Sequence, residues 1–116
     1  MLPKGGYMRS SIRLWMLFPV LMIPLLMLSL EKGDASRGKA VFNRCAVCHG
    51  ASGEGNEAIA KALGAQIPVL SSKEVQSLND AALKKVIIEG KGKMKPVALT
   101  DVEVADVIAF LRTLKK

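Results

Sequence analysis

Hydrophobic residues near the C-terminus recur every three or four positions and predict an amphipathic helix over residues 101–114. The segment TDVEVADVIAFLRTLKK opens with Thr100 and Glu103, which have the spacing of a capping box. It ends in basic residues, as the helix dipole favours. The apolar stripe consists of Val104, Val107, Ile108, Leu111 and Leu114. We therefore expect this helix to bury one face.

The same spacing predicts two more helices. In DASRGKAVFNRC, Asp34 is suited to cap the N-terminus. The residues on one face of that helix are Gly38, Val41, Phe42 and Cys45. In LNDAALKKVIIEG, Asn79 or Asp80 is the expected cap, and Gly90 is expected to end the helix in the left-handed conformation. Its buried stripe is Leu83, Val86 and Ile87.

The segments between these helices are shorter and richer in turn residues. A short helical turn is predicted from Ser71, with Glu74 completing a second capping box. Glycine and proline make GASGEGNEA and KGKMKPVA loops. No segment alternates as a strand would, so we expect an all-α domain.

An uncharged apolar run, LWMLFPVLMIPLLMLSL, fills positions 14–30 and follows a basic stretch. Its 17 residues are at the lower edge of what spans a bilayer, and the upstream positive charge places the N-terminus in the cytoplasm. We expect an apolar helix that serves as a retained single-pass anchor, in preference to a cleaved signal peptide with its best cleavage site after Ala35. Pro19 and Pro24 weaken a helix but are tolerated in membranes.

The chain therefore divides into residues 1–30, a signal anchor or signal peptide, and residues 31–116, an exported domain. We expect the domain on the periplasmic side of the bacterial inner membrane, anchored through residues 14–30, or soluble in the periplasm if the leader is cleaved. A buried core helix would need a polar face, which this run lacks.

Composition narrows the classes of function. The formal net charge is +7, but the part after residue 30 holds 14 basic and 10 acidic residues. That balance is only mildly basic and no nucleic-acid-binding motif is present, so we expect no nucleic-acid partner. Only Phe42 and Phe110 are aromatic after residue 30. So small an aromatic content favours a domain whose core includes a staple or a cofactor.

The segment CAVCHG, residues 45–50, holds the only histidine and both cysteines of the chain. A thioredoxin-like dithiol is disfavoured because such cysteines follow a strand. Structural zinc needs four ligands, and the chain has no second cluster of cysteine or histidine to complete the set. A disulfide across two intervening residues would close a very short loop and stabilise the fold little. Covalent haem fits best, because Cys45 and Cys48 can each bond one vinyl group and His49 then lies over the ring to bind iron. The spacing C-x-x-C-H is typical of c-type haem attachment.

From about Asp34 to Lys116 the chain resembles class I, single-haem c-type cytochromes. The matching features are Gly38 to Phe42 as G-x-x-x-F, Cys45, Cys48 and His49, Pro68, Met94, and the helix over residues 101–114. The resemblance implies a small cytochrome c fold whose first and last helices cross around one covalently bound haem c, with close approach at Gly38. Phe42 and Phe110 would pack nearby, and the haem would complete the core.

Met94 is the candidate for the second axial ligand of the iron. It is the only methionine after the leader, lies 45 residues after His49, and is flanked by Lys93 and Lys95 in a polar loop where packing explains little. Met/His ligation is the combination of electron-carrying c-type haems. The resemblance also implies pocket residues in IPVL, with the carbonyl of Pro68 facing the outer nitrogen of His49 and Leu70 following it.

With both axial positions filled, we expect a one-electron carrier and not an enzyme. Lys91, Lys93 and Lys95 bracket Met94 and would steer an acidic redox partner, although a merely solvated loop is an equal explanation. A haem sensor or weak peroxidase is the alternative if Met94 leaves the iron. A thiol–disulfide oxidoreductase using Cys45 and Cys48 is a weaker alternative.

Overall fold

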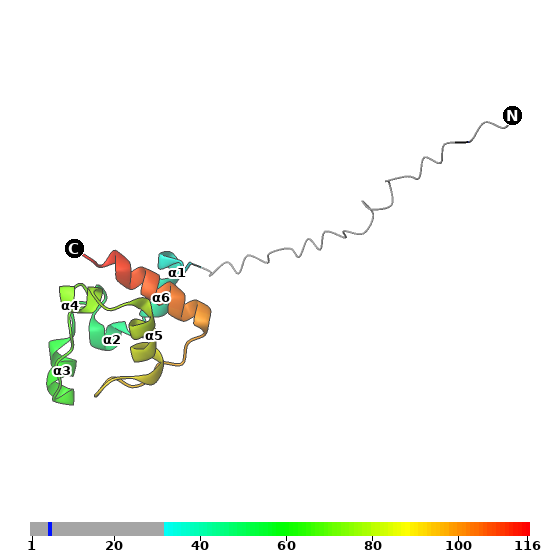
Figure 1. Cartoon of the computed structure of the whole chain (residues 1–116). Coiled ribbons are helices and arrows are strands. Elements are labelled where there is room, and N and C mark those ends of the chain that lie inside the picture. The colour runs from blue at the N-terminus through cyan, green and yellow to red at the C-terminus, as the bar shows by residue number, and fades with distance from the viewer. Residues whose placement is uncertain (1–4, 6–31) are drawn as a thin grey trace.

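A computed structural model describes residue 5 and residues 32–116, and within these it is a helical domain with no strands (Figure 1). The helices are α1 (Ala35–Phe42), α2 (Ala46–His49), α3 (Glu57–Leu63), α4 (Lys73–Gln76), α5 (Asp80–Glu89) and α6 (Asp101–Thr113). Residues 14–30, the predicted anchor helix, lie outside the described part. No helix that the structure describes has the length and apolar character to cross a membrane.

The first and last helices, α1 and α6, cross in contact, as predicted. A Cβ atom at Gly38 would overlap the backbone carbonyl of Asp106, so only glycine allows this approach. The rings of Phe42 on α1 and Phe110 on α6 lie 5.1 Å apart between centroids and are tilted by 51°. This distance is typical of a favourable aromatic pair.

A buried carboxylate on α6 holds the start of α1. Asp106 is 3% exposed and accepts hydrogen bonds at 2.8 Å from Nε of Arg37 and at 2.6 Å from the backbone N–H of Asp34. The hydrogen bond from Arg37, followed by that from Asp34, keeps the pKa of Asp106 below its ordinary value. These bonds join residues about 70 positions apart.

Side-chain caps set most helix boundaries. Asp34 caps α1, Asn79 caps α5, and Thr100 with Glu103 forms the predicted capping box of α6. The cap of α4 is Ser72, one residue after the predicted Ser71. Gly90 has a positive φ of 76° with an extended ψ of 172°, so it ends α5 outside the left-handed helical region where we expected it.

Helix α3 was not predicted, and its first residues fall in the segment that the sequence assigned to a loop. It begins after Asn56, whose Oδ1 accepts hydrogen bonds from the backbone N–H groups of Ala58 and Ile59. It ends at Gly64, which has a left-handed conformation. Figure 1 shows α3 and the loop after α5 at the same end of the domain.

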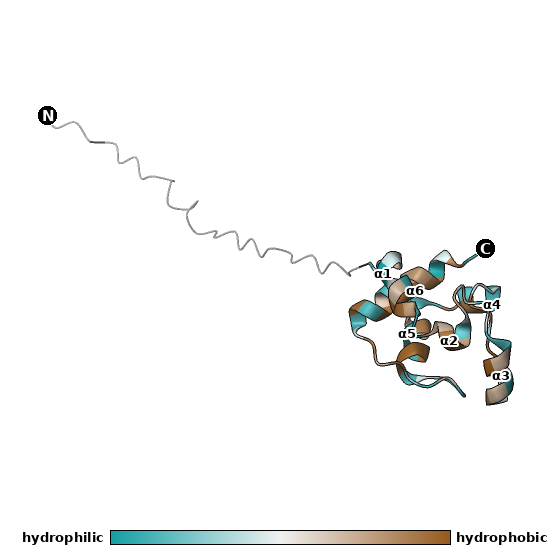
Figure 2. Ribbon diagram, turned by 180° about the vertical axis from the view of Figure 1, so that it is seen from behind, coloured by the Kyte–Doolittle hydropathy of each residue, from teal (hydrophilic) through white to brown (hydrophobic). Residues whose placement is uncertain are grey.

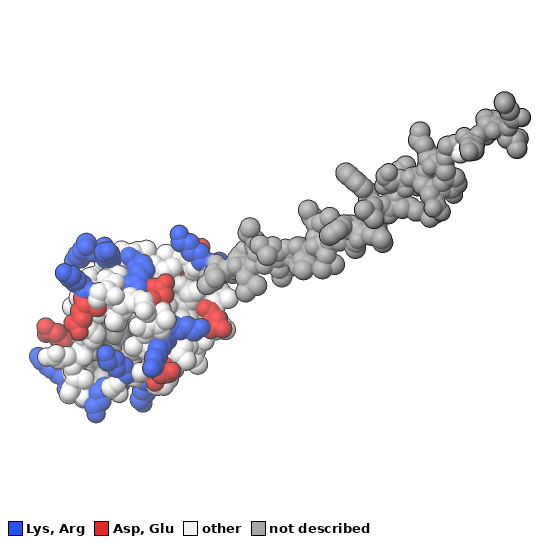
Figure 3. All heavy atoms as spheres, in the orientation of Figure 1, with Lys and Arg blue, Asp and Glu red and all other residues white. Residues whose placement is uncertain are grey.

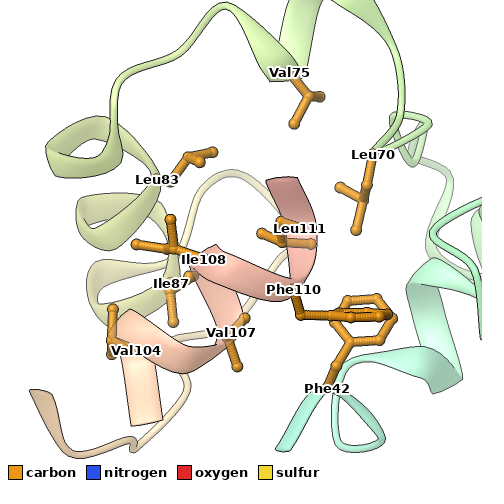
Figure 4. Packing of buried hydrophobic residues seen from close by; sticks show 10 residues of the cluster. All are labelled: Phe42, Leu70, Val75, Leu83, Ile87, Val104, Val107, Ile108, Phe110 and Leu111. Atoms are coloured by element: carbon orange, nitrogen blue, oxygen red, sulfur yellow. The ribbon is translucent and has the colours of Figure 1, made fainter. Parts of the chain in front are cut away.

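The hydrophobic core lies between α6, α5, α1 and the segment around α4. Figure 4 shows the side chains that gather there, with the tilted rings of Phe42 and Phe110 next to each other. The buried residues are Phe42, Leu70, Val75, Leu83, Ile87, Val104, Val107, Ile108, Phe110 and Leu111. Hydrophobic and hydrophilic segments alternate along α6 in Figure 2, as its predicted stripe requires.

Candidate functional site

The two cysteines and the histidine lie on one turn of helix. Cys45 is the N-cap of α2, and its carbonyl accepts hydrogen bonds from the backbone N–H groups of Cys48 at 3.2 Å and His49 at 3.0 Å. This turn brings Cys45 and Cys48 to neighbouring positions. The two thiols are free and form no disulfide.

The loop after α2 folds back on this turn and closes its end. The backbone N–H of Gly55 donates to the carbonyl of His49 at 2.6 Å, and that of Asn56 donates to the carbonyl of Cys48 at 3.0 Å. The side-chain Nδ2 of Asn56 donates to the carbonyl of Val47 at 3.1 Å. Asn56 therefore binds α2 through its amide nitrogens and caps α3 through its oxygen.

Sequence reasoning missed this double role of Asn56. A cap residue followed by Glu57 is a detectable signal for the start of α3. The bond from Nδ2 to Val47 is a tertiary contact that the sequence pattern does not encode.

Met94 lies in a hairpin-like loop that follows α5. Lys91 and Met94 exchange two backbone hydrogen bonds, of 3.0 Å and 2.9 Å, and form an isolated β-bridge. The backbone N–H of Val97 donates to the carbonyl of Ile87 at 2.9 Å, which ties the loop back to α5. The Met94 side chain is half-buried, whereas Lys91, Lys93 and Lys95 are exposed.

Two adjoining cavities of about 560 and 510 Å³ bring α2 and the Met94 loop together. The residues that line both are Cys45, His49, Ala65, Gln66, Lys91, Lys93 and Met94. Cys48 lines the first, and Pro68 and Leu70 line the second. The site residues predicted from sequence thus surround one connected hollow.

Leu70 and Pro68 both line the second cavity but differ in burial. Leu70 is buried in the core, and its carbonyl accepts a hydrogen bond at 2.9 Å from the Gln76 side chain, which also donates to Leu111 of α6. Pro68 is exposed, and no hydrogen bond reaches Nδ1 of His49. The contact between the Pro68 carbonyl and His49 stays a prediction.

Burial shifts the two key ionisable groups toward their neutral forms. Burial lowers the pKa of His49, whose Nδ1 atom is inaccessible and has no hydrogen-bond partner. Burial also raises the pKa of Cys45, against a smaller lowering by the nearby Arg44 charge. A neutral imidazole is the form that binds metals. A protonated Cys45 is the opposite of the thiolate that thiol–disulfide enzymes use.

The described residues do not form a site in which protein side chains alone could bind a metal ion. Between residues 32 and 116, no three His, Cys, Asp or Glu side chains gather in a way that could hold a metal ion. The chain's only histidine and both its cysteines lie in that range. A closed zinc site has no further ligands there.

A model of the cytochrome c family matches residues 35–115. The match includes every helix of the described domain, and the chain therefore belongs to the cytochrome c family. No curated protein and no solved structure matched the chain. Family membership bears out the predicted resemblance, the all-α fold and covalent haem c as cofactor, and it indicates electron transfer based on that haem.

The residues of the hollow fit a covalently bound haem. The walls supply two unpaired thiols, a thioether and a half-buried imidazole whose inaccessible Nδ1 atom has no hydrogen-bond partner. Much of the core also lines the second cavity, including Phe42, Val107 and Leu111, so a flat apolar group there would extend the core. Both volumes lie in the range of small-molecule sites.

Proposed function

We propose that this protein is a one-electron carrier whose haem c is bonded to Cys45 and Cys48, with His49 and Met94 as the axial ligands of the iron. The observation that carries this proposal is that one connected hollow is lined by both thiols, the only histidine and the only methionine after the leader. The haem supplies a reversible one-electron change, and the protein supplies its position and surroundings.

Each residue has a distinct task in this proposal. The thiols of Cys45 and Cys48 fix one edge of the cofactor to the backbone of α2. His49 is presented as a neutral base, because burial lowers its pKa. Met94 supplies the second ligand, so the iron has no open position for a substrate. That arrangement suits a carrier rather than an enzyme.

Absorption spectra and the intact mass of the mature protein test the proposal. Material made in a host with haem-attachment machinery should be red, retain its colour after denaturation and carry the mass of one haem. Met94→Ala should lose the weak far-red ferric band of methionine ligation, whereas Val47→Ala, an exposed neighbour of the cysteines, should retain it. Colourless but folded protein would refute the proposal.

We also propose that the lysines around Met94 steer an acidic redox partner. Lys91, Lys93 and Lys95 are exposed and line the first cavity together with Arg44, so their charges border the proposed haem site. Figure 3 shows Lys and Arg side chains spread over one face of the domain, with fewer acidic ones between them. Such a rim raises the rate of encounter with a negative surface.

Variants with neutral side chains distinguish steering by the lysines near Met94 from an effect of the net charge of the whole domain. Replacing Lys91, Lys93 and Lys95 with Gln should slow reduction by an acidic partner at low salt and should weaken its salt dependence. The matched control replaces Lys39, Lys73 and Lys115, which are exposed but do not line the cavities. An equal effect of both triple variants would show that only net charge matters.

Finally, we propose that the domain works on the periplasmic side of the bacterial inner membrane and is anchored through residues 14–30. The apolar run and the basic residues before it support this placement. Fractionation of cells that produce the full chain should find it in the inner membrane, with the domain digested by protease added to spheroplasts. A protease-resistant domain inside intact spheroplasts would contradict the proposal.

A further inference from the structure

The two ends of the Met94 loop meet at Gly90 and Pro96. Gly90 has a φ of 76°, and a Cβ atom there would lie 2.5 Å from the carbonyl oxygen of Met94 and 3.0 Å from Cδ and the backbone nitrogen of Pro96. The α-carbon of Gly90 therefore lies directly against the backbone of Met94 and the ring of Pro96. Backbone atoms cannot rotate away from such a contact as the end of a side chain can.

Further bonds make this loop a closed unit. The paired hydrogen bonds between Lys91 and Met94 close it across the middle, and the bond from Val97 to Ile87 fixes its exit against α5. The position of the Met94 backbone is thus set by the end of α5. Any displacement at residue 90 is transmitted to residue 94 over a contact and not through a flexible segment.

We propose that Gly90 and Pro96 are positioning residues that set how far Met94 reaches into the cavity. The missing side chain at 90 lets the Met94 carbonyl come close, and the rigid ring at 96 keeps it there. This inference rests on the proposed role of Met94 as an iron ligand. Neither residue touches the iron in this proposal, since both act through the loop backbone.

Competition by an added iron ligand measures how firmly the loop keeps Met94 on the iron. Imidazole can bind the iron only in molecules whose Met94 has left, so its apparent affinity follows the fraction of open loops. In Gly90→Ala the Cβ displaces the Met94 carbonyl, and we expect the ferric protein to bind imidazole about tenfold more tightly or better, with a weaker far-red band. Pro96→Ala should shift both quantities in the same direction by about threefold, because it restores backbone freedom.

Gly92→Ala is the matched control. Gly92 lies in the same loop and also has a positive φ, of 57°, but a Cβ atom there meets nothing within 4 Å. Gly92→Ala therefore also places a side chain at a positive φ, but it does not displace Met94. We expect its imidazole affinity to change by less than about twofold, which is below the shift expected for Pro96→Ala, and its far-red band to persist.

The outcomes separate this inference from the proposed function. If the unaltered protein lacks the far-red band, or if Met94→Ala retains it, the proposed ligand is wrong. If Met94→Ala behaves as expected but Gly90→Ala binds imidazole like the unaltered protein, or no more tightly than Gly92→Ala, the positioning role is wrong. If circular dichroism shows that Gly90→Ala does not fold, the test rests on Pro96→Ala, because Pro96 is exposed and its replacement should leave the fold intact. An imidazole affinity of Pro96→Ala equal to that of the unaltered protein would then overturn the inference.

Discussion

Arg37 on α1 and Asp106 on α6 form two hydrogen bonds, with Nε to Oδ2 at 2.8 Å and Nη2 to Oδ1 at 3.1 Å. Only 4% of the Asp106 side chain is exposed, whereas 60% of the Arg37 side chain is. The carboxylate thus lies inside the helix crossing and the guanidinium covers it from outside. Such a partly buried pair is screened less by salt than a surface pair.

The lowered pKa of Asp106 predicts a pH dependence of stability. Its folded-state pKa is below the ordinary value, so the carboxylate stabilises the fold above that ordinary value. This stabilisation is lost as the pH falls through the lowered pKa. Urea unfolding should therefore show Asp106→Asn less stable at neutral pH, with the gap narrowing in acid. A gap that stays constant from neutral pH into acid would show that the charge is not the cause.

Gly38→Ala tests the close approach of α1 and α6. The added Cβ overlaps the carbonyl of Asp106, and the helices must move apart. We expect the free energy of unfolding to fall by about 3 kcal/mol, as in overpacked cores. Ser36→Ala, at an exposed position of α1, is the control and should change it by less than about 0.5 kcal/mol. Equal stability of both variants would contradict the tight crossing.

Phe110→Ala tests the aromatic pair in the core. Phe110 is 7% exposed and its ring packs on that of Phe42. We expect a loss of about 3 to 5 kcal/mol in the free energy of unfolding, measured with urea on the haem-containing protein. Val102→Ala, on the same helix but 50% exposed, should cost far less. A loss below about 1 kcal/mol for Phe110→Ala would place the ring outside the stabilising core.

Asn56 allows its two roles to be separated. Asn56→Asp keeps the oxygen that caps α3 but removes the donor to Val47, whereas Asn56→Ala removes both. We expect Asn56→Ala to lower the free energy of unfolding by about 1 kcal/mol, as for lost N-caps. Asn56→Asp should lose less, because a carboxylate is also a good cap. If the aspartate variant lost as much as the alanine variant, the bond to Val47 would be the dominant contribution.

The helices with a clear stripe and cap were predictable from sequence. Asp34, Asn79 and Thr100 cap the helices where the pattern placed them, because capping depends on residues only three positions apart. Helix α3 was missed because glycines precede it and none of its residues is fully buried. Its start depends on Asn56, which also contacts α2.

The chemistry of the site was predictable only in part. The spacing of Cys45, Cys48 and His49 is local, and one helical turn of α2 realises it. That Met94 lines the same hollow depends on how the loop after α5 returns across the domain, which no local pattern encodes. The contact of Gly90 with Met94 and Pro96 is likewise a product of the tertiary fold.

The crossing of α1 with α6 has a consequence for the order in which this chain is made. The ribosome makes α1 well before α6, the helix on which it packs. Until α6 has been made, the ring of Phe42 lacks its partner Phe110. The contacts that close the core across α1 therefore join distant parts of the chain and form only after α6 has emerged.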